Sequence, residues 1–403
     1  MKRRVPGYYK DFTCIASECK DNCCVGGWEI DIDDETVEYY KTVEGEFGDR
    51  LRASIGRTDE YCFKLKDGKC PFLDEKGLCE IYGTLGDDKM GVVCTQFPRY
   101  TEYYGNVKET GIGLACEEAE RIIFSDRTPF SMEGEEIAEE EVEDQEYDKE
   151  LAEQLFIVRD RCFAILELDR SLYQKMAFLV AMCHEVQEKI NENKVKDIPQ
   201  VLKAYEADAF DRIINALKAE MHEDKSKEAE GSMVTDGEVA GTVRDKVESM
   251  LCAYQELEVL GDIWPNALDH MFTTFHEDDC SEDQYRELAA EFYEGLGERQ
   301  HEYKNLLSYF VFRYFMKAAY DHDVFEKMQL CVTNFFVVRE MDLVKWLDNQ
   351  KKFSFQDRID TVHIFSREVE YSEDNIESLA EEFLFDDVFK REELIGLLLD
   401  CDR

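Results

Sequence analysis

Apolar residues recur at helical spacing through the second half of the chain. Five of them follow one another at steps of three and four residues, which places them on one face of a helix: Leu151, Leu155, Val158, Cys162 and Ile165. A second stripe has similar spacing and consists of Leu172, Met176, Leu179, Cys183, Val186 and Ile190. Ser171 with Gln174 predicts a capping box at the start of this second helix.

The helical pattern continues toward the C-terminus. Similar segments are expected near 243–261, 283–296, 301–320 and 323–347, whereas the polar residues 222–242 are typical of a long loop. The sequence shows no internal repeat. Residues 151–403 are therefore expected to form an all-α domain.

The first 130 residues follow a different pattern. They hold nine of the fifteen cysteines, many glycines and only short apolar segments. We expect an irregular Cys-rich, metal-binding domain with short strands, in which Cys62 is packed within one strand. Residues 131–150 carry many carboxylates and almost no opposing charge, so like-charge repulsion predicts a solvated acidic linker. The expected fold class is mainly α.

Length and charge limit the possible functions. A chain of 403 residues can bury a core without disulfides, and no apolar run reaches the length of a membrane span. The basic N-terminus lacks the apolar segment of a secretory signal, so we expect a cytoplasmic protein with reduced thiols. The formal net charge of −44 argues against nucleic acid as a partner. Residues 2–4 leave weak membrane association open, and the oligomeric state is not indicated.

Eight cysteines of the first part are candidate metal ligands: Cys14, Cys19, Cys23, Cys24, Cys70, Cys79, Cys94 and Cys116. Thiolates bind soft metals, and four suffice for zinc or a 4Fe–4S cluster. The paired Cys-x2-Cys knuckles of zinc sites are missing here, and the wider spacings favour iron–sulfur, with zinc as the alternative. Some of the eight are expected to be packed thiols, because one cluster needs only four.

The cysteines of the helical half are scattered, and we expect them to be packed thiols. They are Cys162, Cys183, Cys252, Cys280, Cys331 and Cys401.

Three cysteine segments together carry a resemblance to a known family: FTCIASECKDNCCVGGWEIDID, GKCPFLDEKGLCEIYGTLGDDKMGVVCTQFPRY and GLACEEAERI. They resemble the flagellin lysine-N-methylases, part of a wider group with a CxxCxxCC-type zinc- or iron-chelating region. The resemblance continues in HEYKNLLSYFVFRYF at 301–315 and REVEYSEDNIESL at 367–379. It implies a methyltransferase that moves a methyl group from S-adenosylmethionine to lysine ε-amines of flagellin. It also implies a 4Fe–4S cluster held by four of the same eight cysteines, without saying which.

Neither standard site for the methyl donor is present. The glycines of ETGIGLAC lack the third glycine of a dinucleotide-type motif, and Gly26 stands where a radical-type enzyme would have its third cysteine. The donor site and the catalytic residues therefore stay unassigned. Trp28 is expected to be a core anchor, with cation binding as the alternative, and Arg99 to hold a carboxylate or a structural ion pair. Two further classes stay open: a metal-binding protein acting in electron transfer, and a protein-interaction module.

Overall fold

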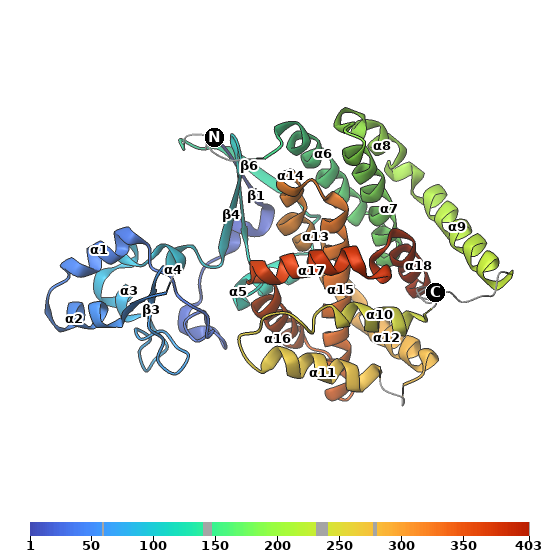
Figure 1. Cartoon of the computed structure of the whole chain (residues 1–403). Helices are drawn as coiled ribbons and strands as arrows, with labels where there is room; N and C mark the ends of the chain where they lie inside the picture. The colour runs from blue at the N-terminus through green and yellow to red at the C-terminus, as the bar shows by residue number, and fades with distance from the viewer. Residues whose placement is uncertain (59, 140–146, 231–240, 277–279, 403) are drawn as a thin grey trace.

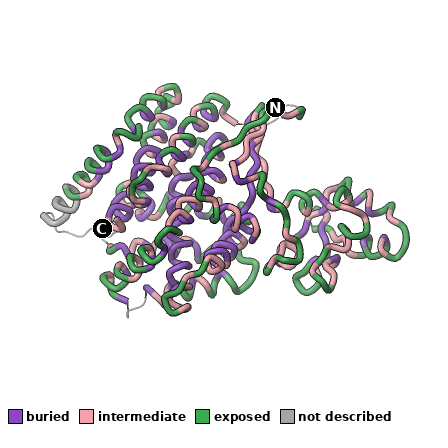
Figure 2. The backbone as a smooth tube through the Cα atoms, turned by 180° about the vertical axis from the view of Figure 1, so that it is seen from behind, coloured by how far each residue is buried: buried purple, intermediate pink, exposed green. Residues whose placement is uncertain are grey.

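The chain folds into a small lobe, a central sheet and a larger helical body (Figure 1). The computed structural model describes residues 1–58, 60–139, 147–230, 241–276 and 280–402, with the backbone alone for 223–230. Buried residues are concentrated in the helical body, whereas the small lobe is mostly exposed or half-buried (Figure 2).

Four strands form the central sheet, in the order β4-β5-β1-β6. Their bounds are β1 Lys2–Pro6, β4 Arg99–Tyr104, β5 Val107–Ile112 and β6 Met132–Glu136. β1 runs parallel to β5, and antiparallel to β6, so that Lys2 lies opposite both Val107 and Glu136. β4 and β5 form an antiparallel hairpin.

The small lobe contains a two-stranded sheet and short helices. Its elements are α1 Asp34–Thr42, α2 Gly45–Ser54, β2 Ile55–Arg57, β3 Tyr61–Phe63, α3 Glu80–Leu85 and α4 Val92–Gln96. Cys62 lies in β3, which confirms the expected strand.

Helix α5, Glu117–Ser125, leads from the sheet toward the body. The helices of the body are α6 Lys149–Leu166, α7 Leu172–Asn191, α8 Ile198–Ala204, α9 Phe210–Glu230, α10 Val243–Cys252, α11 Ile263–Phe275, α12 Glu282–Leu296, α13 His301–Tyr314, α14 Ala318–Asp321, α15 Val324–Asp348, α16 Phe355–Phe365, α17 Glu373–Phe385 and α18 Arg391–Cys401. The mainly α fold is confirmed.

Helix α15 lies at the centre of the body and is buried on nearly every side. Some of its buried polar groups are paired, which lowers the cost of burying them. Asp342 of α15 accepts hydrogen bonds from Tyr303 at 2.7 Å and Thr361 at 2.6 Å, and it pairs with the fully buried Arg358. Arg358 also lies 3.2 Å from Glu302, so one ion network joins α13, α15 and α16.

The hydrophobic cores divide the chain differently from the expected domains. Tyr8, Tyr104 and Ile112 of the sheet region belong to the same core as the helical body. A separate core, built from buried residues between Ile30 and Ile81, belongs to the small lobe. The expected boundary at residue 130 is therefore not marked by a break between cores.

Several helix ends differ from expectation. Ser171 precedes α7, but its side chain makes no capping bond, because Gln174 donates instead to Asp402 at 2.5 Å. The segment expected at 243–261 is helical only to Cys252. The one expected at 301–320 is interrupted after Tyr314 by a 3-10 turn.

The polar segment 222–242 is only partly as expected. Residues 222–230 continue helix α9 instead of forming a loop. Lys, Glu and Ala are strong helix formers, and this explains the longer helix. Residues 231–240 lie outside the described residues.

The acidic segment 131–150 is not wholly a linker. Residues 132–136 form the edge strand β6. The basic N-terminus supplies the opposing charge, since Arg3 lies 3.1 Å from Glu135 and Lys10 lies 2.8 Å from Glu133. Residues 140–146 of this segment lie outside the described part.

Candidate functional site

The loop that carries the first cysteines, residues 14–28, ends in a tightly packed Gly-Gly-Trp turn. A Cβ atom on Gly26 would lie 2.7 Å from the Trp28 ring, so only glycine fits there. Gly27 has a φ of +80°, a conformation that glycine adopts without strain. The Asn22 side chain accepts a hydrogen bond from the Cys24 amide at 3.0 Å and so shapes the turn that contains the adjacent cysteines.

Trp28 connects the small lobe to the body. Its ring stacks on Tyr371 with centroids 5.6 Å apart, and Phe97 lies 5.7 Å from it. The Arg367 guanidinium lies 5.9 Å from the Trp28 ring. Trp28 also packs against the small-lobe core, which agrees with its expected role as an anchor.

Four of the candidate ligands lie together against the small-lobe core: Cys24, Cys70, Cys79 and Cys94. Hydrogen bonds with Cys23 and Cys70 perturb the Cys24 thiol, and the contact with Cys23 raises its pKa most strongly. The hydrogen bond with Cys24 raises the pKa of Cys70, and burial raises that of Cys94 to about 12. We call these four cysteines the small-lobe thiols.

The remaining candidates lie closer to the helical body. Burial and the neighbouring Glu117 raise the pKa of Cys19 to about 11. Cys14 and Cys116 are its nearest thiols, and burial raises the pKa of Cys116 to about 12. The eight cysteines thus form two groups, with Cys23 beside the first group and near Tyr371.

Cysteine thiols are suitable ligands for soft metals, but these side chains are not arranged around a common point. Among the described residues, no three His, Cys, Asp or Glu side chains stand where they could hold a metal ion. The convergence of the cysteines on one centre is therefore not seen, and their role as ligands stays a prediction.

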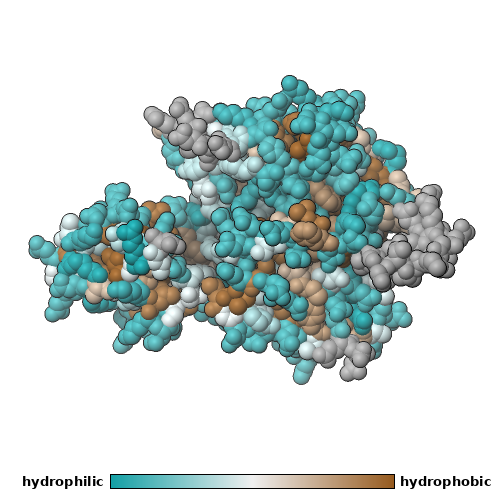
Figure 3. All heavy atoms as spheres, in the orientation of Figure 1, coloured by the Kyte–Doolittle hydropathy of each residue, from teal (hydrophilic) through white to brown (hydrophobic). Residues whose placement is uncertain are grey.

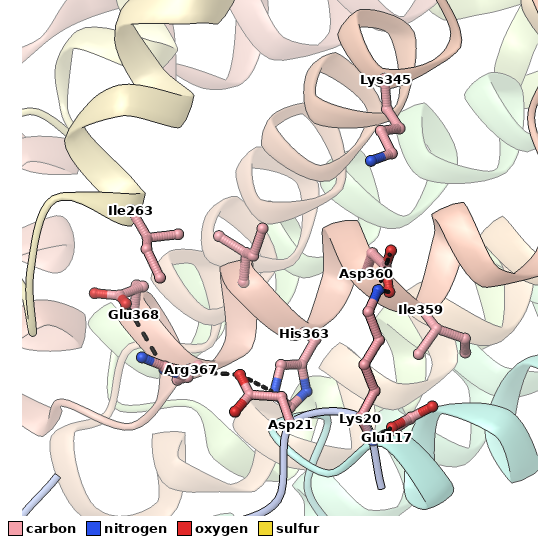
Figure 4. Close-up of a pocket in the computed structure, with 11 residues that line it drawn as sticks. Lys20, Asp21, Glu117, Ile263, Lys345, Ile359, Asp360, His363, Arg367 and Glu368 are labelled. Atoms are coloured by element: carbon pink, nitrogen blue, oxygen red, sulfur yellow. Dashed lines mark hydrogen bonds and ion pairs between the residues drawn. The ribbon is translucent and has the colours of Figure 1, made fainter. Parts of the chain in front are cut away.

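A pocket of about 290 Å³ lies where the cysteine loop meets the helical body (Figure 4). It is lined by Lys20, Asp21, Glu117, Ile263, Lys345, Ile359, Asp360, His363, Ile364, Arg367 and Glu368. These residues come from the loop, from α5, α11, α15 and α16, and from a π-helical segment at Ser366–Glu370. Such segments often occur at functional sites, and this one presents Arg367 and Glu368 to the pocket.

Polar contacts fasten the cysteine loop to the pocket wall. The Lys20 ammonium group donates to both carboxylate oxygens of Asp360, at 3.0 and 2.9 Å. Its backbone amide donates to Glu117 at 2.7 Å. Asp21 accepts a hydrogen bond from Arg367 at 2.8 Å. Residues far apart in sequence therefore share one site.

Behind the pocket lies a buried carboxyl group that the sequence did not single out. Glu120 is fully buried, and its Oε2 lies 3.6 Å from Nδ1 of His363. Burial raises the pKa of Glu120 to about 8. Although burial opposes it, contact with Asp21 and Glu120 raises the pKa of His363 to about 10. Only the packing of α5 against α16 reveals this pair.

Two basic features have structural roles. Arg4 of the N-terminal run lies 3.5 Å from both Glu109 and Asp160. Arg99 lies over the Phe12 ring at 4.9 Å, and this cation–π contact was not expected. Within the described residues, no helix has the length and apolar character needed to cross a bilayer.

The cysteines of the helical half are mostly packed, as expected. Cys162, Cys183 and Cys331 are fully buried, and Cys280 is 9 % exposed. Cys252 is the clear exception, because it lies exposed at the end of α10.

Comparisons with known proteins give the family. The model for the FliB lysine N-methylase C-terminal domain matches residues 159–397, more than half of the chain. Lysine-N-methylases of Salmonella choleraesuis and Salmonella typhimurium are each 32% identical over 129 residues, which cover 30% of this chain and 32% of those proteins. The flagellar biosynthetic protein FliU of Salmonella muenchen is also 32% identical over 129 residues, 76% of its length.

The aligned part thus spans about a third of the two lysine-N-methylases. No solved structure matches the chain. Most of the pocket wall, from Ile263 to Glu368, lies inside the segment matched by the family model. The chain belongs to the FliB lysine N-methylase family.

Proposed function

We propose that this protein transfers a methyl group from S-adenosylmethionine to lysine ε-amines of flagellin. The observation that carries the proposal is the family match over residues 159–397. The printed names of the relatives, lysine-N-methylase and flagellar biosynthetic protein, support lysine as the target and a flagellar context. The pocket at the cysteine loop is the described cavity best placed for this chemistry, because it joins charged and apolar walls.

The reaction sets clear demands on the site. The lysine nitrogen attacks the methyl carbon, the carbon–sulfur bond breaks, and S-adenosylhomocysteine leaves. The attacking amine must first lose a proton, because a free lysine has a pKa of about 10.4. A neighbouring base or removal from water assists this loss. His363 lines the pocket and lies 3.6 Å from the buried Glu120, so this pair is the described acid–base pair nearest to a bound amine.

We also propose that four of the cysteines bind a 4Fe–4S cluster, with zinc as the alternative. The small-lobe thiols support this assignment, because they gather in one core and perturb one another. They would need to turn toward a common point to act as ligands. All fifteen cysteines are free thiols, which supports a reducing compartment such as the cytoplasm.

Incubation of anaerobically purified protein with S-adenosylmethionine and flagellin tests the function. We expect mass spectrometry of flagellin peptides to show lysines that carry added methyl groups. Protein that retains its metal but leaves every flagellin lysine unmodified would contradict the proposal. That result would favour a metal-binding protein without methylase activity.

A further inference from the structure

The acidic residues of the pocket already have partners. The Asp21 carboxylate lies 2.8 Å from Arg367 and 3.6 Å from His363. Asp360 is held by Lys20. An incoming ammonium group would have to displace one of these cations.

The other two acids are matched as well. Glu117 forms an ion pair with Arg121 at 2.8 Å, and it also accepts the Lys20 amide. Glu368 is 3 % exposed and accepts the backbone amide of Leu260 at 3.1 Å. The carboxylates therefore give little reason for a further cation to enter.

The cationic side of the pocket is different. Lys345 extends from α15 toward the pocket, and no described carboxylate lies within ion-pair distance of its ammonium group (Figure 4). Nε of Arg367 is buried without a hydrogen-bond acceptor among the described residues, since the nearest Glu368 oxygen is 3.8 Å away. Arg367 lies beside Asp21 and Glu368, at the other end of the pocket from Lys345, so it is not placed to share a ligand group with Lys345 (Figure 4).

The apolar part of the pocket limits the kind of anion. Ile263, Ile359 and Ile364 line it beside the charged groups. A bare inorganic anion would leave these side chains without a partner, whereas a carboxylate attached to a carbon chain would contact them. A chain with a net charge of −44 repels anions, so an anion site needs local cations to offset this repulsion.

We propose that this pocket binds the α-carboxylate of the methyl donor, with Lys345 as its ion-pair partner. The inference rests on the proposed function, because that function names S-adenosylmethionine. It places the carboxylate of the donor, and not the substrate lysine, against α15. Lys345 is thereby a positioning residue for the donor.

Equilibrium dialysis with labelled S-adenosylmethionine tests the inference without flagellin. Lys345→Met keeps a long, unbranched side chain and removes its charge. We expect this variant to bind the donor about tenfold or more weakly, the effect of losing a charge-assisted hydrogen bond. Lys203→Met, on the exposed surface of α8, is the matched control and should bind like the wild type.

Decarboxylated S-adenosylmethionine gives the decisive comparison, because it lacks only the carboxylate. We expect the wild type and Lys345→Met to bind it with equal affinity. Unchanged binding of S-adenosylmethionine by Lys345→Met would overturn the inference. It would also be overturned if inorganic phosphate bound with the same dependence on Lys345 and the donor did not bind.

The two proposals can fail separately. Lys345-dependent donor binding without methylation of flagellin would contradict the proposed function and support the site. Methylation of flagellin, with donor binding that ignores Lys345, would support the function and overturn the site.

Discussion

Gly26 shows how a single residue can hold the cysteine loop in place. Its missing side chain lets the Trp28 ring lie directly against the backbone, and Trp28 in turn stacks on Tyr371 of the body. Trp28 and Tyr371 come from segments that are far apart in sequence. Gly26 thus makes room for one of the contacts between the cysteine loop and the body.

Gly26→Ala should therefore destabilise the protein. The added methyl group would overlap the Trp28 ring, and overpacking of this kind costs about 1–3 kcal/mol. Thermal unfolding and tryptophan fluorescence measure the effect. Gly83→Ala is the control, because a Cβ there meets nothing within 4 Å. Equal stability of the two variants would show that the ring does not pack as described.

The raised pKa of Glu120 predicts that the stability of the folded protein depends on pH. Its pKa is raised from 4.5 to about 8 by burial, so ionisation favours the unfolded chain increasingly as the pH rises from 4.5 to 8. The pKa of His363 is raised from 6.5 to about 10, so its contribution is present below pH 6.5 and is lost as the pH rises through 10. Both groups make the folded state less stable in alkali.

Glu120→Gln removes the first of these titrations. We expect urea unfolding to show that the stability of the variant relative to the wild type rises between pH 6 and pH 9. Parallel pH profiles for the two proteins would mean that Glu120 is not buried as a carboxyl group in contact with His363.

At the level of elements, α15 organises the helical body through charged groups as well as apolar ones. Arg358 of α16 reaches Asp342 of α15 and Glu302 of α13, and all three side chains are buried. Burial raises the pKa of Asp342 to about 6, while Arg358 opposes this rise. A buried network of this kind is sensitive to the loss of any member.

Arg358→Met should destabilise the protein by about 3–5 kcal/mol, because it leaves the Asp342 carboxylate buried without its cation, whereas Glu302 keeps its ion pair with Arg299. Arg212→Met, on the exposed face of α9, should change stability by less than about 0.5 kcal/mol. Chemical denaturation measures the free energy of unfolding of the two variants. A small effect for Arg358→Met would show that the network does not form in solution.

The grouping of four cysteines in the small lobe leads to a separate prediction about metal binding. Serine substitutions at Cys24, Cys70, Cys79 and Cys94 should each abolish most of the iron and sulfide bound by anaerobically purified protein. Cys62→Ser is the control from the same lobe, because Cys62 lies in β3 and is not among the small-lobe thiols. Full iron content in all four variants would assign the ligands elsewhere.

The sequence predicted some elements better than others. Helix α7 was visible from its apolar stripe, but its capping box failed because Asp402, far along the chain, binds Gln174. Strand β6 was hidden in an acidic segment, because its counter-charges are far away in sequence, on Arg3 of the neighbouring strand β1 and on Lys10 just after it. The apolar pattern therefore predicted the helix, whereas its capping bond and strand β6 depend on residues far away in sequence.

At the scale of the whole molecule, the candidate site joins segments that no local motif connects. The cysteine loop was visible from its spacing, whereas Lys345, His363 and Arg367 carry no recognisable pattern in the sequence. They become a site only when α15, α16 and the π-helical segment pack beside residues 14–28. The metal-binding role expected for the loop stays a prediction, and the pocket beside it became visible only in the fold.

The surface of the molecule carries both polar and apolar areas. The face seen in Figure 3 is largely hydrophilic, with hydrophobic areas on both the small lobe and the body. Leu384 and Phe385 at the end of α17 are 74 % and 80 % exposed. The high negative charge is consistent with a substrate that presents lysines, because opposite charge speeds encounter.

Single-turnover transfer of a labelled methyl group to flagellin tests the central claim most directly. Wild type, Lys345→Met and Lys203→Met are each mixed, without oxygen, with labelled S-adenosylmethionine and flagellin. We predict label on flagellin lysines for all three, with Lys345→Met slower at low donor concentration and restored at saturating donor. Absence of label on flagellin with metal-loaded wild-type protein would contradict the claim that this chain is a flagellin lysine methylase.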